Sequence, residues 1–125
     1  MIPVLQVALG GAIGASARYL TNVGVMRLIG PGFPFGTMLV NVLGSFLMGV
    51  LVVLLARKGG TAYAPLLMTG MLGGFTTFSA FSLDALTLME RGETYLSALY
   101  VIASVVLVLG AIVAGMWAAR IVVPL

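Results

Sequence analysis

Residues 70–82 read GMLGGFTTFSAFS, which places two glycines and two threonines inside a long apolar segment. Glycine is a poor helix former, and a β-branched threonine loses side-chain freedom in a helix. We therefore expect a helix over about residues 65–89 that breaks between Gly73 and Thr77. The alternative is a continuous helix that uses Gly73 and Gly74 for close packing, and these residues alone leave both possibilities open.

The composition around this stretch excludes a soluble domain. The chain has 125 residues, of which 62% are hydrophobic and 7% are charged, and its mean hydropathy is +1.23. A soluble domain carries about a quarter charged residues. Apolar segments long enough to cross a hydrocarbon core of roughly 30 Å span about 4–26, 35–56, 65–89 and 95–119. We predict an all-α membrane protein, a single domain over 1–125, with four transmembrane helices and the third helix broken mid-membrane.

The same composition excludes several classes of function. There is no cysteine and no histidine, so thiolate, imidazole and most transition-metal chemistry is missing. No serine–histidine–aspartate set, paired carboxylates or phosphate loop occurs, and we predict that the chain is not an enzyme. The six basic residues are scattered, which predicts no binding of nucleic acid.

The charges in the connections nearly balance across the membrane. With the N-terminus inside, the inner side holds Arg57, Lys58 and Arg120, and the outer side holds Arg27 and Arg91. The positive-inside rule needs a clear excess to fix an orientation. Either orientation should therefore insert, which permits an antiparallel homodimer whose second copy supplies walls for a pathway.

Polar residues share one face on the second and fourth apolar segments. Thr37, Asn41 and Ser45 follow each other at intervals of four residues, as do Tyr100 and Ser104. Polar side chains within a bilayer tend to face protein or a water-filled cavity, and Asn41 brings two amide donors. The alternative for these residues is hydrogen bonding between helices, and Tyr100 alone is compatible with an interfacial position.

Aromatic rings and hydroxyls alternate after the expected break. Phe78 and Phe81 are three residues apart, with Ser79 and Ser82 between and after them. Because an aromatic ring has a positive edge, rings and hydroxyl donors together would line an anion pathway without a fixed charge. A stripe that faces lipid or the protein core is the alternative.

Arg18 is the one basic residue well inside an apolar segment. Such a charge is costly and is normally paired, snorkelling or functional. Asp84, late in the third segment, is a possible partner. A guanidinium near a vestibule would attract anions, so the charge pattern favours anions over cations.

Three motifs make the sequence similar to a known family. GGAIGASARY at 10–19, GTMLVNVLGSFLMG at 36–49 and GGFTTFSAFS at 73–82 resemble the CrcB/Fluc family of fluoride channels. The resemblance implies an antiparallel, dual-topology homodimer with two fluoride pathways. It also implies a structural sodium ion at the dimer centre, held by the backbone carbonyls of Gly73 and Thr76. The pathway residues that it implies are Asn41, Phe78, Phe81, Ser79, Ser82, Thr37, Tyr100, Ser104 and Arg18.

Two positions depart from the family's usual string. Ala80 stands where threonine is usual, which removes a hydroxyl, and Asp84 stands where glutamate is usual, which shortens the acidic arm. The function that the resemblance implies is passive export of fluoride from a microbial cytoplasm across the cell membrane, in bacteria the inner membrane. The alternatives are a small dual-topology, proton-coupled multidrug transporter, which would need an embedded carboxylate, and an assembly subunit that transports nothing.

Overall fold

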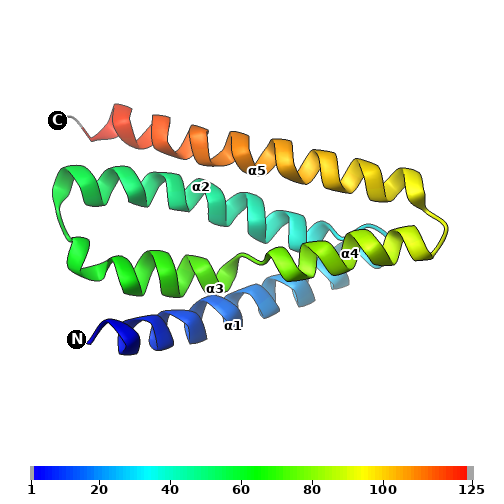
Figure 1. Cartoon of the computed structure of the whole chain (residues 1–125), viewed down its shortest axis with the longest axis horizontal. Helices are drawn as coiled ribbons and strands as arrows, with labels where there is room; N and C mark the ends of the chain where they lie inside the picture. The colour runs from blue at the N-terminus through cyan, green and yellow to red at the C-terminus, as the bar shows by residue number, and fades with distance from the viewer. Residues whose placement is uncertain (1, 124–125) are drawn as a thin grey trace.

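The computed structural model describes residues 2–123, whose helices form rods that lie side by side (Figure 1). Three rods are single helices: α1 (Pro3–Ile29), α2 (Phe35–Lys58) and α5 (Thr94–Val122). The third rod is segmented into η1 (Thr61–Tyr63), η2 (Pro65–Leu72), α3 (Gly73–Phe75) and α4 (Phe78–Glu90). Residues 2–123 contain no β-strand, so the all-α prediction is confirmed.

Three of the rods are long and apolar enough to cross a membrane: α2, the third rod taken as Thr61–Glu90, and α5. α1 has 27 residues but does not meet the same test of hydropathy. Gln6, Arg18 and Asn22 lie within α1 and lower its average. A helix of this length still extends roughly 40 Å at 1.5 Å per residue, so α1 falls short in apolarity and not in length.

The connections between the rods are short, and those after α1 and α2 begin with a glycine. Gly30 follows α1 with φ 90° and Gly59 follows α2 with φ 82°, a left-handed region that favours glycine. The helices continue to these glycines, so α1 and α2 extend two or three residues beyond the apolar segments expected from the sequence. α1 begins and α5 ends at the same end of the molecule (Figure 1).

Glycines bring α2 and α5 into close contact along their length. A Cβ added to Gly49 would collide with the backbone carbonyl of Ile112, and one added to Gly115 would collide with the carbonyl of Phe46. Small residues of this kind allow helix backbones to approach closely where lipid removes the hydrophobic drive to associate. The two helices therefore form a continuous, closely packed pair.

α1 packs in a similar way against the third rod. A Cβ on Gly10 would lie 2.9 Å from the Cα of Gly70, and one on Gly14 would lie 2.9 Å from the amide nitrogen of Phe75. Gly10 and Gly14, spaced four residues apart, thus let α1 approach the third rod closely. This contact places α1 directly beside the segment that leads to the helix break.

The break lies at Thr76 and Thr77, at the end of the stretch expected from the sequence. Thr76 has φ −87° and ψ 157°, and Thr77 has φ −154° and ψ 121°, so both are extended. Gly73 and Gly74 remain helical, although they were expected to open the break. Gly74 packs on α1, where a Cβ would lie 3.0 Å from the carbonyl oxygen of Gly11, and this close approach offsets its poor helix propensity.

Candidate functional site

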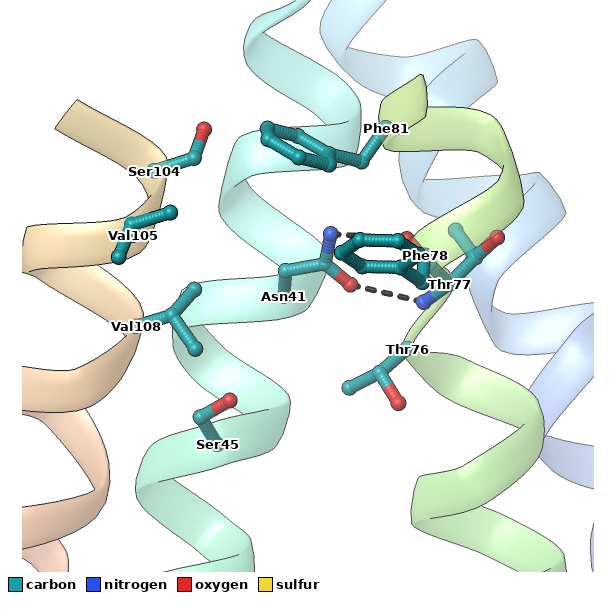
Figure 2. Close-up of a pocket in the computed structure, with 9 residues that line it drawn as sticks. All are labelled: Asn41, Ser45, Thr76, Thr77, Phe78, Phe81, Ser104, Val105 and Val108. Atoms are coloured by element: carbon teal, nitrogen blue, oxygen red, sulfur yellow. Dashed lines mark hydrogen bonds between the residues drawn. The ribbon is translucent and has the colours of Figure 1, made fainter. Parts of the chain in front are cut away.

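One side chain from α2 holds the backbone at the break. The Thr77 amide donates to Asn41 Oδ1 at 2.8 Å, and Asn41 Nδ2 donates to the Thr77 carbonyl at 3.0 Å. Figure 2 shows both bonds joining the asparagine to the extended link between α3 and α4. The first bond satisfies an amide that the interrupted helix leaves without a partner, and the two bonds together join the Thr77 backbone to α2.

The side chain of Thr77 begins the next helix. Its Oγ1 accepts a hydrogen bond from the Ala80 amide at 3.1 Å and lies 3.2 Å from Ser79 Oγ. Threonine is a favoured N-cap because its oxygen satisfies one of the free amides of the first turn. Thr77 therefore joins Asn41 to the start of α4, which carries Phe78 and Phe81.

The other end of the break is held from α1. Arg18 Nε donates to the Gly74 carbonyl at 3.1 Å, and Thr76 Oγ1 donates to the Leu72 carbonyl at 2.9 Å. The pairing of Arg18 with Asp84 considered from the sequence is wrong, because Asp84 Oδ2 accepts a hydrogen bond from Tyr100 OH at 3.2 Å. Arg18 lies beside the break instead, where a cation complements the carbonyl end of a helix.

Some backbone carbonyls at the break accept none of the hydrogen bonds described for residues 2–123 outside the helices. Among the bonds of residues 2–123, those near the break end on the carbonyls of Leu72, Gly74 and Thr77. None reaches the carbonyl of Gly73 or Thr76. These are the two carbonyls for which the sequence motif implied a cation.

A cavity of about 230 Å³ opens beside the break, between α2, α4 and α5. Figure 2 shows the α5 residues across the cavity from Thr76 and Thr77, with Asn41 between them. None of its lining residues is charged. They are Asn41, Ser45, Thr76, Thr77, Phe78, Phe81, Ser104, Val105 and Val108.

One hydroxyl in this lining has no partner. Ser104 is only 4% exposed, and its Oγ makes no hydrogen bond within the part of the chain that the structure describes. A buried polar atom without a partner is costly, and most such groups in proteins are satisfied. The Ser104 hydroxyl is therefore available to a ligand in the cavity.

Aromatic rings continue from the cavity toward the end of the bundle. The Phe78 and Phe81 centroids are 5.5 Å apart, and Phe81 lies 5.2 Å from Tyr100. Tyr100 is fully buried and meets Phe33 edge-on at 5.5 Å. Such separations are typical of favourable ring pairs, so the rings form one connected row.

The structure brings four of the expected pathway residues into the cavity: Asn41, Phe78, Phe81 and Ser104. Five expected residues lie outside its lining. These are Ser79 and Ser82, which are exposed on the single chain, Thr37 and Tyr100, which are buried, and Arg18.

Sequence reasoning missed three residues that line the cavity: Thr77, Val105 and Val108. A signal for Thr77 was present, because threonine three residues before Ala80 at the start of an apolar helix is typical of an N-cap. The two valines carry no such signal, because valine is common on any face of a membrane helix.

Comparisons with known proteins agree with the sequence motifs. Residues 5–116 match the family described as CrcB-like protein, Camphor Resistance (CrcB). The chain is 74% identical over 117 residues to a protein of Cereibacter sphaeroides named fluoride-specific ion channel FluC, covering 94% of each chain. Proteins of the same name from Ruegeria sp. and Mesorhizobium japonicum are 61% and 51% identical, with at least 96% of each chain covered. The chain therefore belongs to the CrcB-like protein family.

Proposed function

We propose that this chain is a fluoride-selective channel that lets fluoride leave a bacterial cytoplasm across the inner membrane by passive electrodiffusion. The relatives that match almost the whole chain carry the name of a fluoride-specific ion channel. The observation that carries the proposal is the cavity at the helix break, whose lining combines hydrogen-bond donors and aromatic rings with no charged side chain.

The chemistry of this lining suits a small, strongly hydrated anion. The Asn41 amide and the unpartnered Ser104 hydroxyl can replace water as donors. The positive edges of Phe78 and Phe81 add weaker stabilisation. Conduction requires binding that is favourable enough for entry and weak enough for exit, and a lysine or arginine in the lining would hold the ion too strongly.

The working unit that we propose is an antiparallel, dual-topology homodimer in which α1 also crosses the membrane. The near balance of basic residues between the two ends supports insertion in both orientations. In the single chain Phe78 is 78% exposed, and Ser79 and Ser82 are also exposed. A second copy would cover this face of α4 and turn an open cavity into an enclosed pathway.

A structural sodium ion is part of the same proposal. Hard cations prefer oxygen ligands, and the carbonyls of Gly73 and Thr76 accept none of the hydrogen bonds described for residues 2–123 outside the helices. These two oxygens would hold the ion. Two ligands are fewer than a hard cation usually takes, so a second copy would contribute the matching pair. The ion would stabilise the break by occupying carbonyls that lipid cannot satisfy.

A fluoride electrode measures the proposed activity directly. Purified protein in liposomes loaded with potassium fluoride should release fluoride on addition of a potassium ionophore, and liposomes loaded with potassium chloride should not release chloride. Absence of fluoride release, or equal release of chloride, would contradict the proposal.

The same assay separates a channel from a proton-coupled multidrug transporter. Coupled exchange needs a carboxylate at the substrate site, whereas Asp84 lies outside the cavity and is bonded to Tyr100. We expect Asp84→Asn to retain passive fluoride efflux. Loss of efflux, together with proton-driven uptake of a cationic dye by the unmodified protein, would favour the transporter.

A further inference from the structure

The contact between Asn41 and Thr77 has the geometry of a strand pairing. In an extended residue the N–H and the C=O point to the same edge, and Thr77 is extended, with φ −154° and ψ 121°. The amide of Asn41 meets both groups, at 2.8 Å and 3.0 Å. A side-chain amide carries an acceptor and a donor in one plane, so it replaces the strand partner that the break lacks.

This pairing uses half of the donor capacity of Asn41. A side-chain amide has two N–H donors, and one of them is bonded to the Thr77 carbonyl. One N–H therefore remains for the cavity that Asn41 lines. The asparagine cannot offer both hydrogens to an ion while the break keeps this conformation.

The pairing also controls the position of the aromatic lining. Thr77 is the N-cap of α4, so fixing its backbone fixes where that helix begins. Phe78 is the first residue of α4, and its one ring contact within residues 2–123 is with Phe81, on the same helix. No ring contact therefore ties Phe78 to another rod.

We propose that Asn41 is a positioning residue, which clamps Thr77 in the extended conformation, sets the start of α4 and thereby places the Phe78 and Phe81 rings, while one N–H serves the ion. The transport part of this inference rests on the proposed function. The clamp itself does not, so the two are tested by separate measurements.

Amide hydrogen exchange tests the clamp without transport. In Asn41→Ala the Thr77 amide loses its acceptor, and we expect it to exchange about tenfold faster than in the unmodified protein. Ser45→Ala is the matched control, because Ser45 lies one turn away on α2 and lines the same cavity without bonding to Thr77. Equal exchange of the Thr77 amide in Asn41→Ala and the unmodified protein would overturn the proposal.

A backbone ester tests the consequence for transport while keeping every side chain. Replacing Thr77 by threonine α-hydroxy acid removes the N–H that bonds Asn41 and leaves both hydrogens of the Asn41 amide in place. We expect fluoride efflux to fall at least about fivefold. The same ester at Thr94 is the control, because that first residue of α5 uses its amide in no hydrogen bond within residues 2–123.

Each result of the ester experiment decides between two roles for Asn41. If the asparagine acts solely by donating to fluoride, the Thr77 ester conducts like the Thr94 ester, and the positioning role is wrong. The ester also makes the Thr76 carbonyl, a proposed sodium ligand, a weaker ligand. A fall confined to the Thr77 ester that persists when the sodium concentration is raised therefore supports the positioning role, and a fall that high sodium restores assigns the loss to the ion and contradicts that role. If the unmodified protein releases no fluoride, the proposed function fails, and the exchange measurement still decides whether the clamp exists.

Discussion

The α2–α5 pair and the third rod must both satisfy their backbone hydrogen bonds in lipid, and they do so by different means. α2 and α5 are continuous, so each satisfies its own backbone, and glycines let them pack closely. The third rod is interrupted at Thr76 and Thr77 and depends on side chains from α1 and α2 to satisfy its backbone. Within the span, backbone groups become available to an ion where the helix is interrupted, because the interior of a continuous helix pairs its amides with its own carbonyls.

The largest effect is expected from a substitution that separates α2 from α5. Gly49→Leu would force a side chain into the backbone of α5 at Ile112, and we expect no folded protein to be recovered. Gly110→Leu is the matched control on α5, because a Cβ at Gly110 meets nothing within 4 Å. Size-exclusion chromatography in detergent measures both variants. A monodisperse Gly49→Leu protein with an unchanged thermal midpoint would show that this contact does not hold the pair together.

A smaller effect is expected where α1 supports the break. Arg18→Met leaves the half-buried Gly74 carbonyl without its donor, which should cost about 1–3 kcal/mol and reduce fluoride efflux. Arg27→Met removes an exposed arginine from the same helix and should be neutral. Thermal midpoints and efflux rates of the two variants give the comparison. Equal midpoints would mean that Arg18 acts through its charge and not through its bond to Gly74.

The sequence predicted the rods better than it predicted the break. Apolar length alone indicates α2 and α5, because lipid leaves the helix as the way to satisfy their backbones. The break was expected from Gly73 onward but lies at Thr76 and Thr77. Glycine propensity is a local quantity, whereas the close packing of Gly74 on Gly11 is a tertiary contact that the local pattern does not contain.

The site was predictable in its residue types and not in their partners. The polar face of α2 predicted that Asn41 would meet protein or a cavity, and it meets both. That its amide pairs with the backbone of Thr77 depends on the extended conformation of a single residue. The segment η2, a π-helix that packs on α1, was not expected either, because the local sequence pattern does not distinguish a π-helix from an α-helix.

A pair of serines on α5 should separate stability from transport. Ser97 Oγ donates to the Ala85 carbonyl at 2.7 Å, so Ser97→Ala should lower stability by about 1 kcal/mol and leave transport per folded channel unchanged. Ser104 Oγ has no partner within residues 2–123, so Ser104→Ala should not lower the thermal midpoint. It should reduce fluoride efflux several-fold, because a donor is lost from the cavity. The reverse pattern would assign Ser104 to packing.

The smallest effect is expected at the end of the bundle, far from the break. The Arg91–Glu93 ion pair is 3.3 Å long, but its side chains are 49% and 43% exposed, so water screens it. Glu93→Gln should therefore change stability by less than about 0.5 kcal/mol and leave efflux unchanged. Arg91→Met should cost more, because Arg91 Nη2 also donates to the Gly32 carbonyl at 2.9 Å and joins the two connections at that end. If Glu93→Gln lowered efflux at constant stability, the charge at this end of the bundle would act on the ion. The pathway would then extend from the break to the connection that contains Arg91 and Glu93.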